Sequence, residues 1–127
     1  MKEIIFVGAG GFIGASIRYV VSSWFMQFSR MGFPLGTFSI NLIGCTLLGI
    51  LIGLSPLKNS VIPVKEFLAI GVLGGFTTFS AFGLESLEMI KAGQYKMTAI
   101  YILGSIILGL LGIFIGIILS RQIFHPA

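Results

Sequence analysis

The sequence predicts an all-α membrane protein with four transmembrane helices, and two observations carry this prediction. Hydrophobic residues make up 56% of the 127 residues and charged residues only 9%, whereas about a quarter of the residues in soluble domains are charged. The charges also cluster, so that four long stretches between them are almost uncharged. A membrane-spanning helix needs about 20 mostly apolar residues. Four such helices use nearly the whole chain, and we expect a single transmembrane domain over residues 1–127.

Charges, glycines and prolines set the expected boundaries of the helices. Pro34, for example, has the position of a helix-starting proline. The expected helices run over residues 4–28, 35–54, 64–90 and 97–121. The third helix is predicted to break mid-membrane near residues 74–78, because the run GGFTTFSAFG puts glycines and hydroxyl residues into an apolar segment. Unwound backbone in a membrane is tolerated only where it is buried in protein or lines a cavity, although a simple packing kink is the alternative.

The basic residues give almost no signal for the orientation of the chain. They fall in two groups: on the side of the termini Lys2, Lys58, Lys65 and Arg121, and on the opposite side Arg30, Lys91 and Lys96. An excess of Lys and Arg in short loops sets orientation, and four against three is close to no bias. Either the chain inserts both ways and pairs as an antiparallel homodimer, or the weak bias is sufficient. Single, scattered basic residues are typical of membrane-surface anchors, so we expect no nucleic-acid partner.

A glycine-rich run in the first helix, IIFVGAGGFIGASIR, resembles the phosphate-binding turn of dinucleotide-binding folds. That motif needs a preceding strand and an acidic residue about 20 positions later, but the next acidic residue here is Glu66. Gly10 and Gly14, four positions apart, instead favour close packing of membrane helices. The sequence also offers no nucleophile–base pair, and its single histidine, His125, lies in the tail. We therefore do not expect an enzyme.

The polar residues inside the spans are neutral, and most of them can donate a hydrogen bond. The second helix offers Thr37 and Asn41, the third offers Thr77, Thr78 and Ser80, and the fourth offers Tyr101 and Ser105. Phe76, Phe79 and Phe82 lie among the polar residues of the third helix. Each polar residue alone is typical of interhelical hydrogen bonds worth about 0.6–2 kcal/mol. Cation paths use carboxylates or carbonyls, and proton paths use Asp, Glu or His. Amide and hydroxyl donors, helped by the positive edges of aromatic rings, instead favour an anion. Together these side chains predict an anion path.

Two charged residues and the predicted break extend this picture. Arg18 is the only charge well inside the first span. It would cost about 2.5–3.5 kcal/mol at the bilayer centre, so it either faces a water-filled vestibule or snorkels to the surface. Glu85 lies three residues past Phe82, where we expect the anion path to meet water. Carbonyls freed at the break can hold a cation such as Na⁺.

Three runs, GGFIGASIRY, PLGTFSINLIG and GGFTTFSAF, together resemble the signatures of the Fluc (CrcB) fluoride channels, in order and over nearly the whole chain. The resemblance implies a multi-pass protein of the cell membrane that lets cytoplasmic fluoride leave passively. It further implies a dual-topology antiparallel homodimer with two fluoride pores and a central structural Na⁺.

The resemblance also implies roles for individual residues. Asn41 would be the pore amide, and Phe79 and Phe82 would turn their ring edges to fluoride. The carbonyls of Gly74 and Thr77 from both subunits would hold the Na⁺. The remaining fluoride-path residues would be the hydroxyls of Thr37, Ser80, Tyr101 and Ser105, the acid Glu85 near the end of the path, and Arg18 in the vestibule. Two positions depart from the family: Ala81 stands where it usually has threonine, and Gly109 offers no hydroxyl where some relatives do.

Two other interpretations stay open at this point, a coupled exporter and a membrane scaffold that does not transport. A small four-helix exporter coupled to protons or sodium would share the size and the dual topology, but it would need an acid within the first helix, and Glu3 is too near its end. A membrane scaffold would explain the glycine spacing, but it gives no reason for the set of donors.

Overall fold

The computed structural model describes residues 1–29, 32–54 and 64–124, and within them the regular structure is entirely helical. Helix α1 runs over Lys2–Met26 and α2 over Leu35–Gly53. The third apolar segment contains the π-helix η2 (Lys65–Leu73), the short α3 (Gly74–Phe76) and α4 (Phe79–Lys91). Helix α5 runs over Tyr95–Phe124.

Within the described residues, four helical segments are long and apolar enough to cross a membrane, which confirms the predicted class. They are Lys2–Met26, Leu35–Gly53, Lys65–Lys91 and Tyr95–Ile123. The observed bounds differ from the expected ones by a few residues. Helix α5 begins earlier because Gly93, at a φ of 73°, ends the preceding helix in the left-handed conformation that favours glycine. Only Gln94 then separates it from the first turn of α5.

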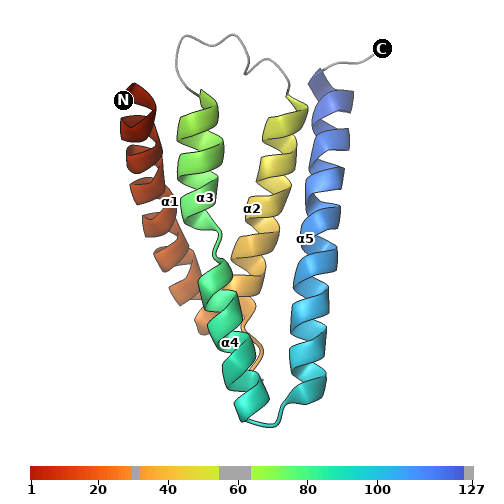
Figure 1. Cartoon of the computed structure of the whole chain (residues 1–127). Coiled ribbons are helices and arrows are strands. Elements are labelled where there is room, and N and C mark those ends of the chain that lie inside the picture. The colour runs from red at the N-terminus through yellow and green to blue at the C-terminus, as the bar shows by residue number, and fades with distance from the viewer. Residues whose placement is uncertain (30–31, 55–63, 125–127) are drawn as a thin grey trace.

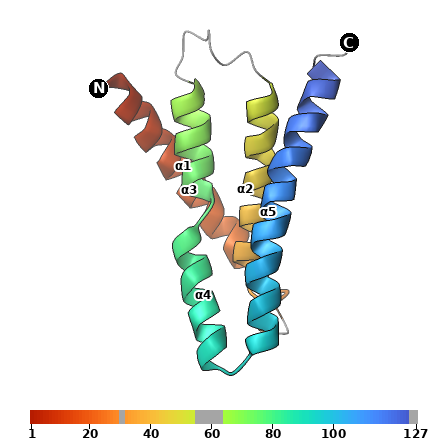
Figure 2. The ribbon, with the colours of Figure 1, turned by 45° about the vertical axis from the view of Figure 1, so that its right-hand side comes forward.

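The helices run up and down in two packed pairs (Figures 1 and 2). Helix α1 packs against η2 and α3, and α2 packs along α5. The N-terminus, the start of η2 and the last described turn of α5 lie at one end, and the α4–α5 turn lies at the other (Figure 1). Lys2, Lys65 and Arg121 are therefore at the end opposite Lys91 and Lys96, as expected, whereas Lys58 and Arg30 lie outside the described residues.

Bare glycine backbones set the distance between the paired helices. A Cβ atom on Gly10 or Gly14 would overlap a carbonyl oxygen of the η2 segment, from Phe67 or Val72 respectively. On the other pair, a Cβ atom on Gly116 would overlap the carbonyl oxygen of Thr46. This confirms that these glycines permit close approach, which is how small residues stabilise helix pairs in lipid.

The backbone of the third segment is extended at two residues. Thr77 has φ −78° and ψ 158°, and Thr78 has φ −150° and ψ 122°, so that α3 ends at Phe76 and α4 begins at Phe79. The hydroxyl oxygen of Thr78 caps α4 by accepting the amide of Ala81 at 3.3 Å. Gly74 and Gly75, within the expected break, remain helical. Gly75 thus serves a helix contact, since a Cβ atom there would lie 2.7 Å from the Gly11 carbonyl oxygen, and the two threonines carry the extended backbone.

Candidate functional site

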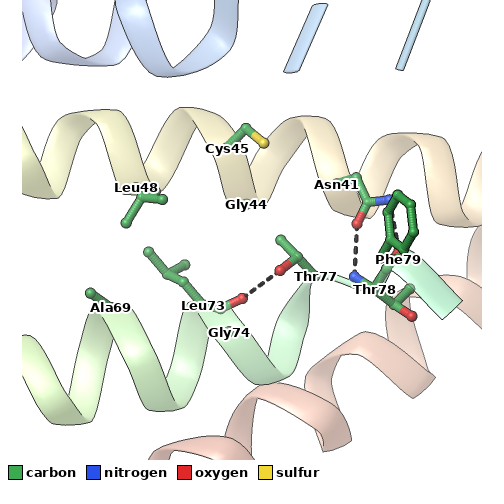
Figure 3. Close-up of a pocket in the computed structure, with 10 residues that line it drawn as sticks. All are labelled: Asn41, Gly44, Cys45, Leu48, Ala69, Leu73, Gly74, Thr77, Thr78 and Phe79. Atoms are coloured by element: carbon green, nitrogen blue, oxygen red, sulfur yellow. Dashed lines mark hydrogen bonds between the residues drawn. The ribbon is translucent and has the colours of Figure 1, made fainter. Parts of the chain in front are cut away.

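The side chain of Asn41 hydrogen-bonds two backbone groups of the extended segment that a continuous helix would pair internally. Its Oδ1 accepts the backbone N–H of Thr78 at 2.8 Å, and its Nδ2 donates to the carbonyl oxygen of Thr78 at 3.1 Å (Figure 3). In a continuous helix the N–H of Thr78 would bond the carbonyl of Gly74. Asn41 takes this donor, so the Gly74 carbonyl loses its helical partner. The amide from α2 therefore holds the extended backbone in place.

The extended segment also touches α2 through a glycine. A Cβ atom on Gly44 would overlap the Cγ2 methyl of Thr77. The hydroxyl of Thr77 points back into its own segment, where it donates to the carbonyl of Leu73 at 3.0 Å (Figure 3). The methyl group and the hydroxyl of Thr77 therefore both have partners within the protein, and its backbone carbonyl oxygen can bind another group.

That carbonyl receives a hydrogen bond from α1. The guanidinium Nη1 of Arg18, a half-buried side chain, donates to the Thr77 carbonyl oxygen at 3.3 Å. Sequence reasoning left open whether Arg18 lies in a vestibule or snorkels to the surface. The structure instead brings its charge to the extended backbone, fifty-nine positions along the chain.

A cavity of about 280 Å³ lies beside the extended segment, between α2 and the third segment (Figure 3). Its lining residues are Asn41, Gly44, Cys45, Leu48, Ala69, Leu73, Gly74, Thr77, Thr78 and Phe79. Four residues expected at the site therefore line one cavity. They are Asn41, Phe79, and the two residues whose carbonyl oxygens are expected to bind the cation, Gly74 and Thr77. Among the described residues, no group of three or more His, Cys, Asp or Glu side chains could hold a metal. The oxygen atoms that the residues lining the cavity offer are those of the Asn41 amide, the threonine hydroxyls and the backbone carbonyls.

A second cluster lies nearer the α4–α5 end and joins three helices. The Oε1 of Glu85 accepts the hydroxyl of Thr37 at 2.7 Å, and its Oε2 accepts the hydroxyl of Tyr101 at 2.7 Å. The ring of Tyr101 is fully buried, with the rings of Phe82 and Phe33 at centroid distances of 5.2 and 5.5 Å. Two of the four hydroxyls expected along the anion path thus donate to the acid expected at its end.

The remaining predicted residues are Phe79, Ser80 and Ser105, and they differ in burial. The ring of Phe79 is 82% exposed, although its centroid lies 5.5 Å from that of Phe82. The exposed Ser80 exchanges a hydrogen bond of 3.2 Å with the hydroxyl of Thr78. The hydroxyl oxygen of Ser105 is buried and has no hydrogen-bond partner within the part of the chain that the structure describes.

Sequence reasoning missed three contributors to these clusters. Thr78 is expected in the break and as a hydroxyl, but the sequence does not indicate that both of its backbone groups bond Asn41. Nothing in the sequence indicates that Gly44 faces Thr77. Phe33, from the loop before α2, carries no polar group that would indicate a role in the site. In the sequence, only the neighbouring Pro34 indicates that this loop has a fixed conformation.

Comparison with known proteins gives a consistent family. A protein-family model described as CrcB-like protein, Camphor Resistance (CrcB), matches residues 5–117. A protein of Agrobacterium fabrum, named fluoride-specific ion channel FluC, is 39% identical over 98% of this chain and 100% of its own length. Proteins with the same name from Azobacteroides pseudotrichonymphae and Helicobacter pylori are 46% and 43% identical over 95% and 93% of this chain, and over 98% and 92% of their own lengths. With its four helices able to cross a membrane, the chain is a multi-pass membrane protein that belongs to the CrcB-like family.

Proposed function

We propose that this protein is a fluoride-selective passive channel that lets cytoplasmic fluoride leave the cell. The observation that carries the proposal is the fixed amide of Asn41 beside the exposed ring of Phe79, in a chain similar over nearly its full length to proteins named fluoride-specific ion channel FluC. Fluoride is small and strongly hydrated, so a pore must replace its water with donors at close range. Neutral amide and hydroxyl donors do this without trapping the ion as a buried charge pair would.

The geometry of Asn41 suits this role. A side-chain amide carries two N–H donors, and one of them is occupied by the carbonyl of Thr78. That bond fixes the orientation of the amide, and the second N–H is left to meet an anion. The ring edges of Phe79 and Phe82, which carry the positive part of the aromatic quadrupole, would contact the same ion.

The cluster around Glu85 would form the next step of the path. Thr37 and Tyr101 present hydroxyl donors on α2 and α5, and both now point at the carboxylate. A fluoride ion arriving there would compete with Glu85 for these donors. Displacement of the carboxylate toward water would release the ion at the end of the path, and Ser80 and Ser105 would supply further hydroxyls along the route.

The assembly proposed is an antiparallel homodimer of dual topology with two pores. The near balance of basic residues between the two ends supports it, since neither orientation is favoured by charge. The 82% exposure of Phe79 also supports it, because a pore-lining ring needs a surface to face. A second copy would supply that surface.

We further propose that a structural Na⁺ is held at the dimer centre by carbonyls of Gly74 and Thr77. Freed carbonyls of unwound membrane segments suit this hard cation. The residues fit a cation. Asn41 accepts the Thr78 N–H, which in a continuous helix would bond the Gly74 carbonyl, and Gly74 and Thr77 line the same cavity. The break would then lie within the membrane, with the cation satisfying backbone groups that lipid cannot.

A coupled exporter is the second candidate, and Glu85 is the observation that favours it. Two hydroxyls bind this carboxylate within the spans, and intramembrane acids are typical of proton-coupled transport. The anion path and the family names favour passive conduction instead.

Efflux from liposomes containing the purified protein tests both candidates. A fluoride electrode and a chloride electrode follow the two ions separately, with and without gradients of protons and sodium. Rapid fluoride loss without chloride loss and without either gradient is the expected result. Fluoride loss only with a gradient would favour the coupled exporter, and no loss of either ion would contradict transport altogether.

A further inference from the structure

The Thr77 carbonyl has a cationic partner within its own chain. Arg18 reaches it from α1 at 3.3 Å, although the two residues are fifty-nine positions apart. An arginine side chain is always charged and donates through a rigid planar fork. One positive charge is therefore already directed at the oxygen that the proposed Na⁺ site would use.

This charge is not neutralised nearby. Across the described ranges, no carboxylate lies within 4.0 Å of Arg18, and the single ion pair there joins the N-terminus to Glu3. An unpaired cation inside a membrane protein is costly unless oxygens or water satisfy it. The Thr77 carbonyl is the one protein oxygen within hydrogen-bonding distance of the Arg18 guanidinium in the described structure.

We propose that Arg18 sets the Na⁺ affinity of the site by competing for the Thr77 carbonyl. This inference rests on the Na⁺ site of the proposed function. The guanidinium stabilises the extended backbone when the site is empty, and it opposes a second cation at the same oxygen by charge repulsion. Arg18 is thus a positioning residue whose charge makes Na⁺ binding weaker and more dependent on concentration.

Two substitutions separate the charge of Arg18 from its hydrogen bond. Arg18→Gln keeps an N–H donor but removes the charge, whereas Arg18→Lys keeps the charge on a flexible stem. Lys91→Gln, at the exposed end of α4, removes an equal charge far from the extended segment. A merely structural role of Arg18 would make the Gln variant less stable at every Na⁺ concentration without changing the concentration dependence.

The experiment measures thermal unfolding of the purified full chain in detergent while Na⁺ replaces a large organic cation at constant ionic strength. A ligand that binds only the folded state stabilises it by RT ln(1 + [L]/Kd), so fitting the unfolding midpoint against Na⁺ concentration gives an apparent Kd for Na⁺. We expect Arg18→Gln to lower this Kd about tenfold or more, because like charges a few ångströms apart in a partly buried site repel by more than the ~1.4 kcal/mol that tenfold represents. Arg18→Lys and Lys91→Gln should stay within about threefold of the native protein.

An unchanged or higher apparent Kd for Na⁺ in Arg18→Gln would overturn the proposal. If that variant does not fold, Arg18→Met keeps the aliphatic stem without the charge and is measured in its place. A lower apparent Kd for Na⁺ then supports the proposal, and an unchanged or higher one overturns it. Absence of any Na⁺ dependence in the native protein would also overturn it. Fluoride efflux from the same preparation keeps the tests distinguishable: efflux without Na⁺ dependence leaves the channel standing, and Na⁺ dependence without efflux refutes the channel alone.

Discussion

Asn41 and Thr78 bond each other twice, with the amide of one side chain serving both the N–H and the carbonyl of one backbone residue, at 2.8 and 3.1 Å. An extended residue between two helices leaves polar backbone groups unpaired, and in lipid each such group costs several kcal/mol. Asn41 satisfies both groups from a different helix. The same side chain therefore stabilises the extended segment and presents its remaining N–H beside Phe79.

Asn41→Asp should abolish fluoride efflux. The substitution preserves the shape but replaces the amide donors with carboxylate oxygens, which repel an anion and face the Thr78 carbonyl. Liposome efflux measures the effect, and Ser16→Ala is the control, because that exposed hydroxyl bonds only the carbonyl of Phe12 in its own helix. Native-like efflux from a folded Asn41→Asp protein would contradict the role of this amide.

Gly44→Ala should destabilise the protein by about 1–3 kcal/mol, as overpacking of a tight contact does. The added methyl group would meet the Cγ2 of Thr77 and push the extended segment away from α2. Thermal or denaturant unfolding in detergent measures the loss. Gly8→Ala is the matched control, since a Cβ atom there has no neighbour within 4 Å. Equal stability of the two variants would show that the segment adjusts freely.

Tyr101→Phe should slow fluoride efflux and lower stability by about 1.5–3 kcal/mol, the range for a hydrogen bond to a charged group. The Glu85 carboxylate would keep the Thr37 hydroxyl but lose the other donor, which now lies at 2.7 Å. Tyr95→Phe, on a side chain that is 69% exposed, controls for loss of a phenol.

A double-mutant cycle with Glu85→Gln isolates the interaction of this pair. Residues joined by a direct hydrogen bond show coupling of about 0.5–3 kcal/mol. Additive effects of Tyr101→Phe and Glu85→Gln on unfolding would mean that the bond is not formed in the membrane protein.

Ser105→Ala should slow efflux without reducing stability. The hydroxyl oxygen of Ser105 is buried and has no partner among the described residues, and an unsatisfied buried polar group costs about 1–3 kcal/mol. Removing it should therefore leave the unfolding midpoint unchanged or raise it, while a donor is lost from the path. A lower midpoint with native efflux would assign Ser105 to packing instead of conduction.

The four-helix membrane architecture follows from the sequence alone, because the length of an apolar, uncharged stretch is a local property. The set of candidate donors follows from it too, since Thr37 and Asn41 lie on one helix face at a spacing of four. The tight glycine contacts of Gly10 and Gly14 followed from the same local spacing.

The contacts between these groups come from the packing of the helices. Asn41 and Thr78 are thirty-seven positions apart, and Thr37 and Glu85 are forty-eight, so their pairing depends on how the helices pack. The extended residues proved to be the threonines, because a Cβ atom on Gly75 would lie 2.7 Å from the Gly11 carbonyl oxygen and that glycine is needed for packing. Hydrogen-bond partners distant in sequence are chosen by packing, and periodicity within one helix carries no information about its neighbour.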